Sequence, residues 1–304
     1  MGLAVSGGPD SLALLLLAHA AIPDRIRAAT VDHGLRSDAA GEARDVAALC
    51  AELAVPHHTL RVEVAAGNVQ ARARTARYDA LAEAFADDGI HSIATAHHAD
   101  DQAETMLMRL NRGSGVSGLA GIRARGSFHA ATVPSPVTLL RPLLGWRRAE
   151  LARIVARAGI VAARDPSNED DSYDRVRIRK ALADADSIDP IALSRSAACL
   201  SDAEDALAAY GERVRADDVW RDDVQGIARF RFGHPRLIEM RVVTAILEGF
   251  GAQPRGSAVA AMIDSLHADG VATLGGVIVR QVREAGATGR DVWEFTREGP
   301  RSNT

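Results

Sequence analysis

The sequence predicts an α/β fold, a doubly wound parallel sheet followed by a second, smaller and mostly helical C-terminal domain. Two observations predict it. Short apolar runs alternate with amphipathic helical patterns over the first 158 residues or so, and beyond about residue 187 the pattern becomes largely helical. We therefore expect two domains, residues 1–186 and residues 187–304.

The expected elements of the first domain alternate along the chain. Strands are expected at 3–5, 26–31, 57–64, 90–96 and 137–140, and helices at 12–18, 38–53, 69–85, 100–110 and 148–158. Repeated strand–helix units form right-handed crossovers, and such sheets bind ligands at the carboxyl ends of their strands. In the second domain we expect helices at 190–214, 237–250 and 258–266 and a hairpin of 277–282 with 292–295.

Composition favours a soluble, cytoplasmic enzyme. The 304 residues are 47% hydrophobic with a formal net charge of −4, and no apolar run approaches the length of a membrane span. No export signal is recognisable, so no membrane association is expected. Cys50 and Cys199 are isolated within helical patterns and are expected to be reduced thiols. The absence of a Cys-x-x-Cys pair argues against an iron–sulfur or sulfur-relay enzyme.

A glycine-rich loop joins the first expected strand to the first expected helix. It contains Ser6, Gly7, Gly8, Pro9, Asp10 and Ser11. Adjacent glycines let backbone N–H groups approach an anion, and a helix N-terminus adds partial positive charge, so the loop predicts a phosphate site with Asp10 holding Mg²⁺. The alternative is a tight turn with Asp10 or Ser11 as the N-cap. The only lysine of the chain is Lys180, so this is not a Walker-type loop.

Acidic side chains gather where the helix expected at 100–110 begins. The segment 97–105 contains two histidines, three acids and an amide. Asp101 and Glu104 are three residues apart and share one helical face, where they could hold a cationic amine. The alternative is a purely structural first turn, which acids stabilise through the helix dipole. Adjacent histidines do not have the spacing of a zinc site.

Taken together, these motifs resemble the tRNA(Ile)-lysidine synthetases, a family within the PP-loop ATP pyrophosphatases. The resemblance extends from residue 2 to about 182 with specific motifs, and more loosely to about 297. The matching segments are Ser6–Ser11, Val31–Arg36, Ala71–Tyr78, His97–Thr105, Arg112–Gly115 with Gly118-Leu119, and Asp165–Asn168. It implies a Rossmann-like fold of the adenine nucleotide alpha hydrolase type and splitting of ATP into AMP and pyrophosphate.

The resemblance also implies a reaction and residue roles. The enzyme would attach free L-lysine to C2 of the wobble cytidine of the CAU-anticodon isoleucine tRNA, through an adenylated cytidine. ATP and Mg²⁺ are then required, with Asp10 and Asp100 holding the metal, and Asp101 and Glu104 binding lysine or taking its proton. His33 is expected near the adenosine, although a loop-capping role is an equal alternative.

Basic clusters predict where RNA binds. Arginines pair with phosphates and stack on bases. The expected contacts are Arg72, Arg74, Arg77, Arg175, Arg177, Arg179 and Lys180, and Arg147 with Arg148 form another basic pair. Ordinary surface arginines are the alternative, and the C-terminal domain is expected to recognise the tRNA body.

Two competing functions remain open from the sequence. One is another PP-loop AMP-forming ligase or tRNA-modifying enzyme, and the other is a nucleotide-binding module without catalysis. The oligomeric state is also open, a homodimer included.

Overall fold

The computed structural model describes residues 1–32, 39–62, 69–163, 174–185, 187–283 and 291–298. The chain divides into two compact units, an N-terminal unit, Met1–Ser201, and a C-terminal unit, Asp202–Thr304. Helix α8, Pro190–Asp218, runs from the first unit into the second. Within the described ranges, no helix combines the length and apolar character needed to cross a bilayer.

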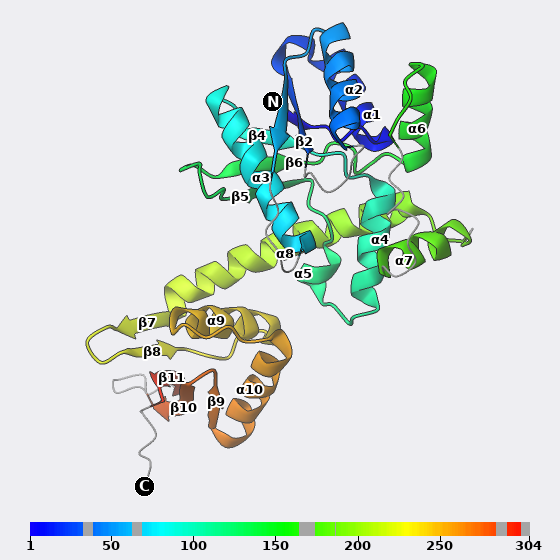
Figure 1. The fold of residues 1–304 in the computed structure, drawn as a ribbon. Coiled ribbons are helices and arrows are strands. Elements are labelled where there is room, and N and C mark those ends of the chain that lie inside the picture. The colour runs from blue at the N-terminus through cyan, green and yellow to red at the C-terminus, as the bar shows by residue number, and fades with distance from the viewer. Residues whose placement is uncertain (33–38, 63–68, 164–173, 186, 284–290, 299–304) are drawn as a thin grey trace. The chain divides into compact units, whose positions relative to one another are not determined.

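A six-stranded sheet forms the centre of the N-terminal unit (Figure 1). Its strands are β1 (Gly2–Ala4), β2 (Arg27–Asp32), β3 (His57–Arg61), β4 (Ser92–Ala94), β5 (Arg125–Phe128) and β6 (Val137–Leu140). The order is β3-β2-β1-β4-β6-β5, in which every neighbouring pair is parallel except β5 with β6. This confirms the predicted doubly wound sheet.

The helices of this unit follow the expected alternation with the strands. They are α1 (Pro9–Ala21), α2 (Ala39–Glu52), α3 (Val69–Asp87), α4 (Ala99–Leu110), α5 (Val116–Leu119), α6 (Arg148–Arg157) and α7 (Asp174–Ala183), with a short 3₁₀ turn at Pro23–Arg25. The five helices expected in this half all form, with ends that differ by a few residues.

Successive strand residues enter two different cores, one on each face of the sheet. Leu3 packs with α1, α2 and α6, whereas Ala4, next along β1, lies against the core that α3 closes. Ile93 and Ala94 of β4 divide between the α3 core and the α1 core in the same way. Because side chains alternate across a strand, a sheet buried on both faces needs apolar residues at consecutive positions. This accounts for the continuous apolar runs in the sequence.

The strand order places a topological switch between β1 and β4. From β1 the chain moves outward through β2 to β3, and then returns to add β4 on the other side of β1. Ligands of doubly wound sheets bind in the crevice at such a point, beyond the carboxyl ends of the two strands. The Ser6–Ser11 loop follows β1 and the segment 95–101 follows β4, so both predicted motifs meet at this crevice.

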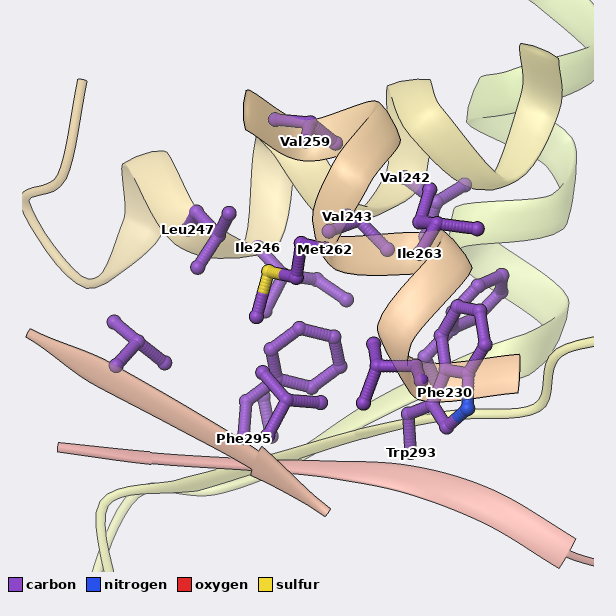
Figure 2. Close-up of a cluster of buried hydrophobic side chains, with 14 of the residues drawn as sticks. Phe230, Val242, Val243, Ile246, Leu247, Val259, Met262, Ile263, Trp293 and Phe295 are labelled. Atoms are coloured by element: carbon purple, nitrogen blue, oxygen red, sulfur yellow. The ribbon is translucent and has the colours of Figure 1, made fainter. Parts of the chain in front are cut away.

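The C-terminal unit contains both helices and a sheet. Helices α9 (Arg236–Gly249) and α10 (Gly256–Asp269) pack on a five-stranded antiparallel sheet of order β7-β8-β11-β10-β9. Its strands are β7 (Val219–Asp222), β8 (Ile227–Phe230), β9 (Val271–Leu274), β10 (Val277–Arg283) and β11 (Asp291–Arg297). Figure 2 shows the core between the two layers, where Ile246, Met262 and Phe295 converge and Trp293 is fully buried. The predicted helices and the β10–β11 hairpin are present, and β7, β8 and β9 are additional.

Candidate active site

The Ser6–Ser11 loop connects β1 to α1 and is closed by its own serines. The Ser6 amide donates to Ser11 Oγ at 3.1 Å, and Ser11 Oγ donates to the Gly8 carbonyl at 3.0 Å. Gly7 has φ +86°, a conformation that strains any residue with a Cβ. Gly8 is the N-cap of α1 and no side chain caps this helix, so neither Asp10 nor Ser11 is the N-cap. The loop therefore leaves a helix N-terminus uncapped, which suits an anion.

Asp10 in the first turn of α1 faces the segment after β4. Its Oδ2 lies 3.4 Å from Nε2 of His98, whose side chain is fully buried. Its Oδ1 is buried and, among the described residues, has no hydrogen-bond donor. A buried carboxylate oxygen without a partner is costly unless a cation or water reaches it. Asp10 thus has the chemistry of a Mg²⁺ ligand, since Mg²⁺ takes one or two carboxylates together with phosphate oxygens.

His98 joins the two motifs by capping α4. Its Nδ1 accepts from the Asp101 amide at 3.3 Å, while Asp101 Oδ2 accepts from the His98 amide at 3.1 Å, a reciprocal capping box. The same imidazole contacts Asp10 through Nε2. This capping role was not predicted, because the usual N-cap residues are Ser, Thr, Asp and Asn. The signal available was Asp101 three residues after His98, the spacing of a capping box.

Asp100 is engaged at the start of α6. Its Oδ2 accepts from the Arg148 amide at 2.8 Å, and its Oδ1 accepts from Arg147 Nε at 3.2 Å. Burial would raise the pKa of Asp100, but the hydrogen bonds from Arg148 and Arg147 hold it below the ordinary value. This anchoring of α6 was not foreseen. The role of Asp100 as a metal ligand stays a prediction.

Asp101 and Glu104 lie on one face of α4, opposite arginines of α7. Arg175 contacts both, Asp101 Oδ1 at 3.1 Å and Glu104 Oε2 at 2.8 Å, as the spacing of three residues on a helix allows. Arg179 Nε donates to Glu104 Oε1 at 2.7 Å. Arg148 adds a third guanidinium, 3.8 Å from Glu104 Oε1. The side chain of Glu104 is 1% exposed and that of Asp101 16%, so Asp101 is the more accessible acid.

His97, beside these acids, lies in a positive environment. Burial and the charges of Arg141, Arg74 and Arg175 lower the pKa of His97 to about 4, against the opposing effect of Asp101. Its Nδ1 is 2.9 Å from Thr95 Oγ1. The imidazole is therefore neutral at physiological pH.

The remaining predicted residues are more dispersed. On α3, Arg72 and Arg74 are exposed, and the guanidinium carbons of Arg74 and Arg77 lie 5.1 and 5.3 Å from the centre of the Tyr78 ring. On α7, Arg177 pairs with Asp174 and Lys180 is exposed. The structure thus brings Arg175 and Arg179 to the acids of α4. His33 and the segment Asp165–Asn168 lie outside the described residues.

Comparison with known proteins finds close relatives along almost the whole chain. Residues 1–185 match the PP-loop domain family. The tRNA(Ile)-lysidine synthase of Novosphingobium aromaticivorans is 45% identical over 97% of this chain and 88% of that protein. The enzyme of the same name from Zymomonas mobilis is 38% identical over 99% of this chain and 89% of its own length, and that of Ruegeria pomeroyi is 40% identical over 92% and 68%.

A solved structure shares the fold of part of this chain at low identity. The U34-tRNA thiolase NcsA from Methanococcus maripaludis, solved with its 4Fe-4S cluster, matches with a TM-score of 0.51 and 15% identity. The match covers 65% of this chain and 69% of that chain. At this identity the likeness shows a common fold only.

Proposed function

This chain belongs to the tRNA(Ile)-lysidine synthase family, and from that premise we propose that it attaches lysine to C2 of the wobble cytidine of the CAU-anticodon isoleucine tRNA. ATP is split into AMP and pyrophosphate, and the cytidine is adenylated before lysine attacks. One structural observation supports this most directly. His98 links Asp10 of the Ser6–Ser11 loop (the phosphate loop) to Asp101 of α4 (the acidic helix), so that a nucleotide and an amine would meet in one crevice.

The Ser6–Ser11 loop would bind the leaving pyrophosphate. The backbone N–H groups at the start of α1 have no side-chain cap and can donate to phosphate oxygens. Asp10 would hold Mg²⁺ through its unpartnered Oδ1, with Asp100 as the second predicted ligand. Bound there, Mg²⁺ would draw negative charge from the phosphates as the bond between the α- and β-phosphates breaks.

Asp101 and Glu104 would receive the lysine. Its ε-amine is protonated in water and must lose a proton before it attacks, and a nearby carboxylate can hold the ammonium group or accept that proton. Asp101 is the better placed for direct contact because its side chain is more exposed than that of Glu104. Glu104 is buried and paired with Arg175 and Arg179, so it would hold these arginines in place beside Asp101.

The neutral His97 suits this site as well. An imidazole with a pKa near 4 carries no charge at pH 7, so it does not repel the lysine ammonium. RNA phosphates would be bound by arginines at the edges of the site, namely Arg74 and Arg77 on α3 and Arg177 on α7. The C-terminal unit would contact the body of the tRNA.

The decisive experiment supplies the isoleucine tRNA transcript, ATP, Mg²⁺ and labelled lysine. We expect label in the RNA, and none when the wobble cytidine is replaced by uridine. Label in the uridine transcript at the same level would refute the assignment.

The same assay tests the phosphate loop. Asp10→Asn should abolish RNA-dependent AMP formation, because Asn is neutral and holds Mg²⁺ poorly. Asp24→Asn is the matched control, since Asp24 is exposed in the turn after α1 and its replacement removes the same charge. Equal AMP formation by the two variants would remove Asp10 from the metal site.

A further inference from the structure

A hollow on the N-terminal unit, apart from the acids of α4, is lined by residues of α3 and of the β5–β6 hairpin. Its volume is about 320 Å³, at the lower end of the range for small-ligand sites. The residues that line it include two aromatic rings, an imidazole and three polar or charged side chains: Arg74, Thr75, Tyr78, Asp79, Phe128 and His129. The size suits a single nucleotide base.

Arginines gather around Tyr78, one of the residues that line this hollow. Arg74 Nη2 lies 3.5 Å from the Tyr78 hydroxyl, and Arg77 lies over the same ring. The Nε atoms of Arg77 and Arg141 are buried and have no hydrogen-bond acceptor among the described residues. Arginines close together attract an anion such as a phosphate, and the protein as a whole is negatively charged at −4.

The hollow also contains groups that can recognise a base. The rings of Tyr78 and Phe128 are 5.2 Å apart and tilted by 55°, so their faces do not stack fully on each other. Phe128 is half-buried and His129 is exposed. Aromatic side chains beside arginines are what unpaired RNA bases stack on, and a carboxylate such as Asp79 accepts from the amino group of a base.

The position of the hollow relates it to the acidic helix. Arg74, which lines the hollow, is near enough to His97 for its charge to act on that imidazole, and His97 follows β4 beside Asp101. Phe128 pairs with Val137 at the amino end of β6. Val137 lies three residues before Leu140, which ends β6 at the edge of the sheet where the site lies, so the two residues are roughly 10 Å apart along the strand. The hollow therefore lies close enough to the site for one RNA loop to reach both.

We propose that this hollow seats an unpaired anticodon-loop base next to the reacting cytidine, with its phosphate on Arg74 and its ring against Phe128. The proposal rests on the function proposed above, because it concerns the same RNA substrate. It assigns a positioning site for RNA beyond the predicted phosphate contacts, one that would bring the cytidine to Asp101.

Photocrosslinking of the full-length protein tests the proposal directly. Transcripts would carry 4-thiouridine at one unpaired anticodon-loop position at a time, excluding the wobble position. We expect irradiation to join a base flanking the wobble position to a peptide containing Tyr78, Phe128 or His129, as read by mass spectrometry. Crosslinks confined to α7 or to the C-terminal unit would overturn the proposal.

Substitutions at Phe128 and Arg74, each with a matched control, add a quantitative readout. Phe128→Leu keeps an apolar side chain but removes the ring, and should weaken binding of the anticodon stem-loop about tenfold, while Phe128→Tyr keeps the affinity. Arg74→Ala, at an exposed position, should weaken binding by a similar factor. Arg153→Ala on α6 removes the same charge from another exposed position and is the control, which should bind more tightly than Arg74→Ala. Wild-type affinity in both Phe128→Leu and Arg74→Ala would also overturn the proposal. If lysine still enters the wobble cytidine, only the hollow is refuted, whereas failure of the wild type to modify this tRNA refutes the proposed function.

Discussion

The environment of His97 makes the N-terminal unit sensitive to acid. Burial and the charges of Arg141, Arg74 and Arg175 lower the pKa of His97 to about 4 in the folded protein, while an unfolded histidine titrates near 6.5. At pH values above the unfolded pKa, both states are neutral at this residue and the shift has no effect. As the pH falls from about 6.5 toward 4, His97 becomes protonated in the unfolded chain but stays neutral in the folded protein, and the free energy of unfolding decreases.

The size of the effect follows from the two pKa values. A shift of about 2.5 units corresponds to roughly 3 kcal/mol when the titration is complete. Between about pH 7.5 and pH 5, the part of this loss that is already realised is about 2 kcal/mol. His97→Gln removes the titrating group and keeps a polar side chain beside Thr95, so the variant should lose about 2 kcal/mol less than the wild type over this interval.

The assay must report on the N-terminal unit alone, because the chain has two compact units. Met106 on α4 is 8% exposed, so its oxidation by peroxide, followed by mass spectrometry along a urea series, reports unfolding around the site. Urea midpoints for wild type and His97→Gln at the two pH values give the difference. Parallel loss of stability in both proteins would refute the depressed pKa and the positive environment inferred for His97.

Three further outcomes follow from single contacts. Gly7→Ala should lower the free energy of unfolding by about 1–2 kcal/mol, because Gly7 has φ +86°, and urea unfolding would measure this loss. The same variant should raise KM for ATP, which an AMP-release assay would measure. An unchanged KM would mean that the loop geometry does not matter for nucleotide binding. Asp100→Ala should lower the free energy of unfolding by about 1 kcal/mol and speed hydrogen exchange of the amides in the first turn of α6. Asp100→Asn should restore part of this protection. Equal exchange rates in the wild type and both variants would contradict the anchoring of α6 by Asp100. The native protein should be alkylated at exposed Cys199 and not at buried Cys50, whose pKa burial raises to about 11, and modification of both at similar rates would contradict the described core.

Much of the N-terminal fold could be predicted because its strands are short continuous apolar runs that alternate with amphipathic helical patterns. The loop between β1 and α1 was also predictable, since paired glycines between two apolar runs are typical of a tight connection from a strand to a helix. Strand β5 was not predicted, because Arg125–Phe128 has no alternating pattern and extends only through pairing with β6. The strands β7, β8 and β9 were not predicted, because they lie outside the alternation of strands and helices that marks the N-terminal strands.

The pairings among the candidate site residues could not be predicted from the sequence. Arg175 and Arg179 were counted as RNA contacts from their charge, but they are four apart on α7 and share the face that meets Glu104. Sequence patterns describe one element at a time, and the partner of a buried charge depends on which helix packs against it. For the same reason the link between His98 and Asp10 had no sequence signature.

The central position of β1 in the sheet affects how the protein is made. Gly2 pairs with Arg27 on one side and with Ile93 on the other. The backbone groups on both edges of β1 are therefore hydrogen-bonded only once β4 has been synthesised. During synthesis on the ribosome, the crevice between β1 and β4 can form only after α3 and β4 have emerged from the exit tunnel. A nascent chain arrested before β4 would expose one bare edge of β1, a surface for chaperones or for aggregation.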